Sequence, residues 1–271
     1  MNVNNVKRCL YGFLISGLAC GYLFAQPQPA PLLRVHAHND YAHQRPLFDA
    51  LDHGFCSFEA DIHLVDGQLL VAHDRTRVKP ERTLQSLYLD PLRDRVKKNG
   101  GRVYRDGPEC VLLIDIKGRW QETYPVLRGV LKQYADILST FSEGRKQPRA
   151  ILVIITGDRS KQMFVDETLR YAAYDGELGD LEATESADLI PWISSNWSQT
   201  FKWRGTGVFP EAEKAKLREI LAKAHAHNRH VRFWGSPDQA VFWQEMLDDG
   251  VDLINTDDLA GAQRFLLQEG K

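Results

Sequence analysis

Titratable side chains follow successive apolar segments in the first third of the mature sequence. Glu59 and Asp61 are two residues apart at the end of one such segment, and His38 and His73 end the segments on either side. Side chains two apart on a strand leave the same face. Two carboxylates on one face repel each other unless positive charge neutralises them, and a hard divalent cation with oxygen ligands does so. The pattern predicts a metal site at Glu59 and Asp61 with two imidazoles beside it.

The two histidines suit the cleavage of a phosphodiester. This reaction needs one group that activates the attacking hydroxyl and one that protonates the leaving oxygen, and histidine can do either near neutral pH. A metal would offset the charge on the phosphate oxygens. His38 and His73 are therefore the candidate acid and base. His36 is a second candidate for the first histidine, because it faces the same rim.

Three further polar side chains extend this candidate site. Asp115 ends a fourth apolar segment and could supply a third carboxylate, while Asn39 could add a neutral amide oxygen. Lys117 leaves the same face as Asp115 and could pair with it or contact a phosphate oxygen. Arg159, after a later segment, is a candidate phosphate contact.

The elements that must position these residues alternate between short apolar strands and amphipathic helices. Asp66-Gly67 marks a tight turn between the second and third strand candidates. Eight strand candidates with helices between most of them predict an α/β fold, a single-domain (β/α)8 TIM barrel over residues 33–271. An open doubly wound sheet is the alternative, although its nucleotide-binding fingerprints are absent. The strand candidates are Leu33–His36, Phe55–Ile62, Gln68–Ala72, Val111–Ile116, Ala150–Ile155, Arg170–Tyr174, His230–Phe233 and Asp252–Asn255. The helix candidates are Pro46–His53, Leu84–Lys98, Gln121–Phe141, Pro210–His227, Pro237–Asp248 and Leu259–Gln268.

Several residues outside this set have a structural interpretation. Trp192, Trp197 and Trp203 occupy a long irregular stretch, where core packing is more common than a lid or lipid-contacting rim. His225, His227 and His230 precede a strand, at the end of a barrel that does not carry catalysis. Cys56 and Cys110 lie in apolar sequence and could form a disulfide or stay as buried thiols.

The N-terminal segment is typical of an export signal. Lys7 and Arg8 precede an apolar stretch from Cys9 to Ala25, which is short for a membrane-spanning helix. We therefore expect a signal peptide over residues 1–25, a linker over 26–32 and a periplasmic or secreted location. An uncleaved anchor is the alternative, and the residues before Cys20 fit a lipoprotein signal poorly.

The net charge of the chain limits the kinds of binding partner that we expect. The chain has 271 residues and a formal net charge of −2, so no global field favours nucleic acid or an anionic membrane. An anionic substrate must therefore be held by a local site. The expected partner is a small-molecule or lipid phosphodiester, with transient contact to a membrane surface, no nucleic acid and no implied protein partner.

Residues His36 to Asp74 resemble the phosphatidylinositol-specific phospholipase C and glycerophosphodiester phosphodiesterase superfamily. Glu59-x-Asp61 followed by His73-Asp74 is similar to its metal and second-histidine motif, and His38-Asn39 with Tyr41 is similar to the first-histidine motif of eukaryotic phospholipases C. Asp115-x-Lys117 resembles a later acidic-x-Lys element. The run from His36 to Leu47 resembles a little-characterised subgroup that includes yeast proteins tied by name to mitochondrial inheritance.

The resemblance implies a (β/α)8 barrel, acid/base cleavage by two histidines, and one Ca²⁺ or Mg²⁺ ion held by the acidic residues. It makes Asn39 a metal ligand, favours His38 over His36, and suggests Trp234 as a late barrel element at the substrate site. One departure concerns the first motif, which in glycerophosphodiesterases is His-Arg-Gly and here is His38-Asn39-Asp40. The absent arginine weakens the case for a glycerophosphodiester substrate.

Two other classes of function compete with this hypothesis. An amidohydrolase or PHP-type metal hydrolase would use the His36-x-His38 pair as metal ligands, but it needs further histidines at later strand ends. A non-catalytic barrel used as a binding module has no need of histidines, carboxylates and a lysine together at one rim.

Overall fold

The computed structural model describes residues 28–268. The expected signal peptide therefore lies outside the described residues. Within residues 28–268, no helix is both long and apolar enough to cross a membrane.

Eight parallel strands form the centre of the molecule, as the alternating sequence pattern predicts. Neighbouring strands pair in the order β11-β10-β9-β7-β4-β2-β1-β12, and a parallel bridge between Arg232 and Leu253 joins the two ends. The (β/α)8 barrel prediction is confirmed. The barrel strands are β1 (Val35–Ala37), β2 (Ser57–Val65), β4 (Cys110–Ile116), β7 (Ile151–Gly157), β9 (Ala173–Gly176), β10 (Trp192–Asn196), β11 (His230–Trp234) and β12 (Ile254–Thr256).

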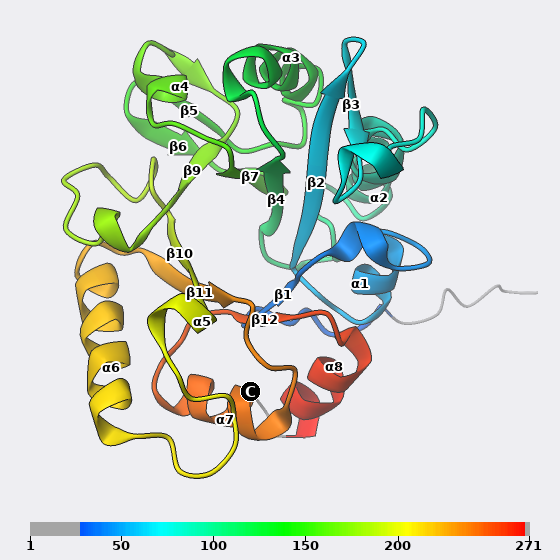
Figure 1. Ribbon diagram of the computed structural model, residues 1–271. Helices are drawn as coiled ribbons and strands as arrows, with labels where there is room; N and C mark the ends of the chain where they lie inside the picture. The colour runs from blue at the N-terminus through cyan, green and yellow to red at the C-terminus, as the bar shows by residue number, and fades with distance from the viewer. Residues whose placement is uncertain (1–27, 269–271) are drawn as a thin grey trace, which may run out of the picture.

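Helices surround these strands on the outside (Figure 1). They bury their apolar stripes against the barrel, as Leu217, Ile220, Leu221 and Ala224 do in α6. The α-helices are α1 (Phe48–Asp52), α2 (Asp90–Lys98), α3 (Trp120–Lys132), α4 (Gln162–Val165), α5 (Trp197–Thr200), α6 (Glu211–Ala226), α7 (Ala240–Asp248) and α8 (Leu259–Gln268). A π-helical turn, η3 (Gln85–Leu89), leads into α2, and three 3-10 turns are η1 (Asp40–Ala42), η2 (Arg75–Arg77) and η4 (Leu178–Asp180).

One strand candidate lies outside the barrel and one barrel strand was missed, although the predicted number of barrel strands was right. The candidate Gln68–Ala72 forms β3 (Gln68–Val71), which pairs antiparallel with β2 and lies outside the barrel. Its turn contains Asp66 and Gly67 at positive φ, as the sequence indicated. The missing barrel strand is β10, which escaped detection because Ser194, Ser195 and Asn196 make most of it polar.

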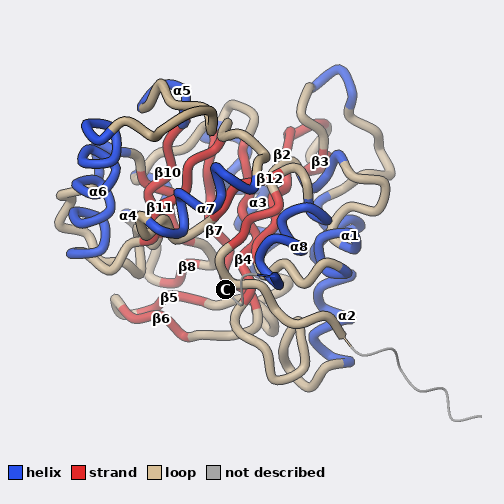
Figure 2. The backbone as a smooth tube through the Cα atoms, turned by 90° about the horizontal axis from the view of Figure 1, so that it is seen from below, coloured by secondary structure: helices blue, strands red, loops and turns tan. Residues whose placement is uncertain are grey.

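The predicted helix Gln121–Phe141 was too long, because α3 ends at Lys132. Its last residues instead start β5 (Thr140–Ser142), which pairs with β6 (Arg145–Gln147) and β8 (Leu169–Arg170) in a separate three-stranded sheet. The candidate strand Arg170–Tyr174 is accordingly divided between β8 and β9. The strands β5 and β6 lie at the opposite end of the molecule from α5 (Figure 2).

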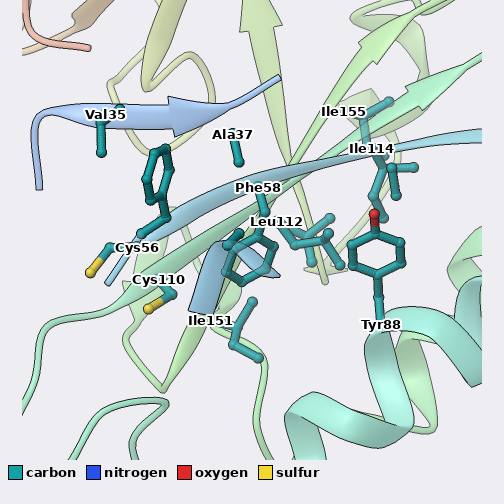
Figure 3. Close-up of a cluster of buried hydrophobic side chains, with 14 of the residues drawn as sticks. Val35, Ala37, Cys56, Phe58, Tyr88, Cys110, Leu112, Ile114, Ile151 and Ile155 are labelled. Carbon is teal, nitrogen blue, oxygen red and sulfur yellow. The ribbon is translucent and has the colours of Figure 1, made fainter. Parts of the chain in front are cut away.

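Apolar side chains fill two regions. The larger lies between strands and helices, where Phe58, Leu112 and Ile155 gather with Tyr88 from η3 (Figure 3). A smaller cluster includes inward-facing residues of the barrel strands and Phe141 of the separate sheet; its buried members are Leu113, Phe141, Leu152, Ile154, Ala173, Trp192 and Leu253. Toward the carboxyl ends of the strands, the inward positions become polar and charged.

The cysteines and tryptophans left open by the sequence are part of the packing. Cys56 and Cys110 lie close together next to paired positions of β2 and β4 and are both buried free thiols (Figure 3). Trp192, Trp197 and Trp203 are also buried, which supports core packing over a lid.

Candidate active site

A cavity of about 800 Å³ opens where the barrel strands end. Its wall brings together side chains from segments far apart in the sequence, because parallel strands present their carboxyl ends at one rim. The predicted residues on this wall are His38, Asn39, Glu59, His73, Asp115, Lys117, Arg159 and Trp234.

Three carboxylates form the centre of the site. One oxygen of each of Glu59, Asp61 and Asp115 lies within 4.8 Å of the others. The register of β2 and β4 explains this, because Asp61 pairs directly with Asp115. Asp61 Oδ1 and Asp115 Oδ1 are buried and accept no hydrogen bond from the described residues. Such oxygens are costly to bury unless a ligand satisfies them.

The three carboxyl groups differ in pKa and therefore in how readily they ionise. Burial and the neighbouring carboxylates of Glu59 and Asp115 raise the pKa of Asp61 to about 7. Burial also raises the pKa of Asp115. Burial alone would raise the pKa of Glu59 too, but a hydrogen bond from His36 and the charge of Arg232 lower it below its usual range. Glu59 is therefore ionised, while Asp61 holds its proton more tightly than an ordinary aspartate.

Lys117 neutralises part of this charge. Its Nζ lies 2.8 Å from Asp61 Oδ2 and 2.8 Å from Asp115 Oδ2. Burial lowers the pKa of the Lys117 ammonium, but the two carboxylates outweigh it and raise that pKa overall. The structure thus bears out the pairing of Lys117 with Asp115 and adds Asp61 as a second partner.

Gly157, at the end of β7, leaves room for the Asp115 carboxylate. Its φ is +78°, and a Cβ at this position would lie 2.0 Å from Asp115 Oδ1. We expect Gly157→Ala to displace Asp115 and weaken divalent-cation binding by about tenfold or more, which titration calorimetry would measure. Gly118→Ala is the matched control, because Gly118 also has positive φ but its Cβ would meet nothing within 4 Å. Equal effects of the two substitutions would mean that backbone strain alone is responsible.

His38 follows β1 and is oriented by Asp257, which follows β12. His38 Nδ1 lies 2.9 Å from Asp257 Oδ1. Burial lowers the pKa of His38, but the Asp257 hydrogen bond and the charge of Glu59 outweigh it and raise that pKa. With Nδ1 engaged, Nε2 is the nitrogen left for proton exchange, as in other histidines anchored by a carboxylate.

His73 comes to the same cavity from the end of the β2–β3 hairpin. Its side chain is 64% exposed, and its Nδ1 lies 3.2 Å from Asp74 Oδ1. The two predicted catalytic histidines therefore share one cavity, with His38 in its interior and His73 at its opening.

The loop after β1 is held by the other residues of the His-Asn-Asp-Tyr run. Asn39 takes the left-handed conformation, with φ of 50°, which asparagine tolerates better than most residues. Its amide oxygen accepts a hydrogen bond from the Tyr41 hydroxyl at 2.6 Å. Asp40 is buried and accepts hydrogen bonds from the Leu47 amide and the Tyr88 hydroxyl. Asp40 and Tyr41 thus shape the loop. Metal ligation by Asn39 stays a prediction, for which the amide oxygen still has a second lone pair.

The structure corrects the placement of His36. Its side chain is fully buried inside the barrel and lines no part of the cavity wall. Its Nε2 lies 3.1 Å from Glu59 Oε2 and its Nδ1 lies 2.7 Å from Ser57 Oγ. Burial lowers the pKa of His36 to about 4, so the ring is neutral. A buried residue that does not reach the rim cannot be the first acid/base histidine.

Arg232 is the main residue that sequence reasoning missed. It is buried in β11, yet it lines the cavity. Its Nε donates to Ser194 Oγ at 3.2 Å and its Nη1 to Asn255 Oδ1 at 3.1 Å, and Nη1 lies 3.5 Å from Glu59 Oε2. The available signal was an arginine between Val231 and Phe233, which in a strand faces away from both.

Arg159 and Trp234 differ in how free they are to contact a ligand. The Arg159 guanidinium donates to the backbone oxygens of Asp175 and Gly157 and lies 3.5 Å from Glu177. Trp234 is 39% exposed on the cavity wall. Trp234 is therefore the freer surface, whereas part of the hydrogen-bonding capacity of Arg159 is used within the wall, and its contact with a phosphate stays a prediction.

Comparison with known proteins agrees with this architecture. Residues 28–175 match the AIM6-like phosphodiesterase domain. Altered inheritance of mitochondria protein 6 of Eremothecium gossypii is 30% identical over 278 residues, which cover 86% of this chain and 69% of that protein. The protein of the same name from Saccharomyces cerevisiae is 30% identical over 280 residues, covering 86% and 70%.

A solved structure shows the same fold at much lower identity. The crystal structure of a glycerophosphodiester phosphodiesterase from Parabacteroides distasonis is 15% identical, with a TM-score of 0.52, and the match covers 90% of this chain and all of that one. The fold, the residues gathered at its rim and the match over more than half of the sequence lead to one conclusion: the chain belongs to the AIM6-like phosphodiesterase domain family.

Proposed function

We propose that this protein is a phosphodiester hydrolase that uses one divalent cation, Ca²⁺ or Mg²⁺, with His38 and His73 as its acid/base pair. The observation that carries the proposal is a cluster of three carboxylates beside the cavity that both histidines line. Glu59 and Asp61 are buried and Asp115 is half-buried, and Asp61 and Asp115 each have an oxygen without a hydrogen-bond partner among the described residues. Membership of a phosphodiesterase domain family supports it.

The donor set fits a hard cation. Glu59, Asp61 and Asp115 offer oxygen only, which suits Ca²⁺ or Mg²⁺ better than Zn²⁺. The charges fit as well. These three carboxylates and Asp175 face two permanent cations, Lys117 and Arg232, which leaves two negative charges for a divalent ion to balance. When bound, the ion would offset negative charge on the phosphate oxygens.

The imidazoles of His38 and His73 would perform the proton transfers. One imidazole takes the proton of the attacking water or substrate hydroxyl, and the other gives a proton to the leaving oxygen. Asp257 holds His38 in one orientation and raises its basicity. Lys117, held 2.8 Å from both Asp61 and Asp115, places a fixed positive charge beside the phosphate position.

The cavity supports a substrate with a polar head. Its wall carries Lys117, Arg159 and Arg232 for anionic groups and Trp234 for an apolar contact. At about 800 Å³ it is within the usual range for small-molecule sites. We therefore propose a glycerophosphodiester or a phospholipid-type head group. The N-terminal apolar stretch supports a periplasmic or secreted location for this activity.

The competing functions find less support. An amidohydrolase or PHP-type site needs histidine ligands, whereas the candidate metal group among residues 28–268 contains carboxylates alone, and His36 is a partner of Glu59. A pure binding module would not need the His38–Asp257 pair on the cavity wall, an arrangement that suits proton transfer to a ligand in the cavity.

Phosphorus NMR would test the proposed function. Purified protein is incubated with glycerophosphocholine, lysophosphatidylcholine, phosphatidylinositol and sphingomyelin, each with Ca²⁺, Mg²⁺ or EDTA. We expect a new phosphorus resonance for at least one diester, loss of at least about 99% of the rate in EDTA, and recovery on adding metal. A cyclic product would show intramolecular transfer in place of hydrolysis. No turnover of any diester by metal-loaded protein would contradict the proposal and favour a binding module.

A further inference from the structure

His36 stands out among the buried polar residues because the proposed reaction does not use it. It lies inside the barrel on β1, two residues before His38, and both ring nitrogens have partners on β2. One partner, Glu59, is a member of the carboxylate group. The other, Ser57, is two residues earlier on the same strand and faces the same way.

The two hydrogen bonds of the His36 ring have a defined direction. A carboxylate oxygen only accepts, so His36 Nε2 carries the hydrogen that it donates to Glu59 Oε2 over 3.1 Å. Nδ1 can then accept the Ser57 hydroxyl hydrogen over 2.7 Å. Ser57, His36 and Glu59 therefore form one directed chain, in which the serine holds the ring orientation and the ring holds one carboxylate oxygen.

Arg232 cannot replace this contact. Its Nη1 lies 3.5 Å from the same Glu59 oxygen, which is longer than a normal hydrogen bond of about 2.7–3.2 Å. It is also a cation, so it repels any metal ion that Glu59 helps to bind. An imidazole that donates from Nε2 to Glu59 and accepts the Ser57 hydroxyl hydrogen at Nδ1 carries no such charge, so it orients the carboxylate without that repulsion.

We propose that His36 is a positioning residue, which fixes the orientation of the Glu59 carboxylate for the divalent cation and is itself fixed by Ser57. This inference rests on the proposed function. It assigns His36 a task different from that of His38: His38 exchanges protons with the substrate, whereas His36 acts through Glu59. Partners that orient a metal ligand in this way commonly change metal affinity by about 10–100-fold.

Metal affinity, measured without substrate, tests the assignment. Titration calorimetry with CaCl₂ and MgCl₂ is applied to the wild type and to His36→Leu, His36→Gln and Ser57→Ala. We expect His36→Leu to weaken binding of the preferred ion by about 10–100-fold. We expect His36→Gln, which keeps an N–H donor, to recover most of this loss, and Ser57→Ala to weaken binding by about twofold to fivefold.

Ser139→Ala is the matched control for general loss of stability. Ser139 is also fully buried and hydrogen-bonded, but to Glu109 and the Arg149 amide. It should lower the melting temperature and leave metal affinity unchanged. At saturating metal, kcat of His36→Gln should return to within a few-fold of wild type, which a catalytic histidine would not allow.

The outcomes separate the two proposals. Wild-type metal affinity in folded His36→Leu would overturn the role of His36 and leave the proposed function intact. If His36→Leu does not fold, Ser57→Ala carries the test, because wild-type metal affinity in this variant would show that the Ser57 contact with His36 does not support the metal site. Absence of Ca²⁺ and Mg²⁺ binding in the wild type would overturn the proposed function, and the assignment of His36 with it.

Discussion

Replacing His38 by glutamine is expected to lower kcat toward a phosphodiester by roughly 10³-fold, because a positioned acid or base contributes about 10²–10⁴-fold. Glutamine is similar in size and keeps hydrogen-bonding groups, so the fold and metal affinity should be unchanged. The measurement is the steady-state rate at saturating metal. His73→Gln should have an effect of similar size if the two residues act as a pair.

Two further variants locate the cause of this loss. His225→Gln is the control, since His225 also contacts a carboxylate, Asp252 at 2.8 Å, but at the opposite end of the barrel; its rate should match wild type. Asp257→Asn should lower the rate by about 10–100-fold and shift the His38 limb of the pH–rate profile to lower pH, because Asp257 raises the pKa of His38. A His38→Gln enzyme with wild-type kcat would remove His38 from the mechanism.

Replacing Asp61 by asparagine should have two large effects of opposite sign. Metal affinity and activity should fall by at least about 100-fold, because a central anionic ligand is lost. The metal-free protein should become more stable. The folded carboxyl has a pKa of about 7, against about 3.9 in an unfolded chain. A raised pKa means that the folded state binds the proton more tightly, so the contribution of Asp61 to wild-type stability in EDTA is largest below pH 4 and is lost as the pH rises through about 7.

Thermal unfolding in EDTA measures this second effect. At pH 8 we expect Asp61→Asn to raise the melting temperature by about 5 °C or more, and at pH 4 the difference should nearly vanish. Asp248→Asn, on the exposed surface of α7, should leave the melting temperature unchanged at both pH 8 and pH 4. A lower melting temperature of Asp61→Asn at pH 8 would show that the ionised Asp61 carboxylate stabilises the metal-free fold. That result would contradict the need for a cation at this position.

Local sequence signals were sufficient to group most of the residues at the rim of the candidate active site. The two-residue spacing of Glu59 and Asp61, and of Asp115 and Lys117, places each pair on one face of a strand whatever surrounds it. The alternation of strands and helices indicates a barrel, and a barrel brings its strand ends together. His38 and His73 could therefore be grouped with the carboxylates before any contact was known.

Tertiary structure decided the roles that depend on contacts between distant segments. His36 has the same strand-face periodicity as His38, and only the packing of β1 against β2 shows that it lies beneath the site with Glu59 and Ser57. Arg232 and Asp257 come from the last two barrel strands, about 170 to 220 residues from their partners, and no local pattern records such a pairing. The sequence by itself determined which chemical groups reach the rim, because strand periodicity is local. Closure of the barrel decided which of them face the cavity and which contact the others from below, because those contacts exist only between strands that folding brings together.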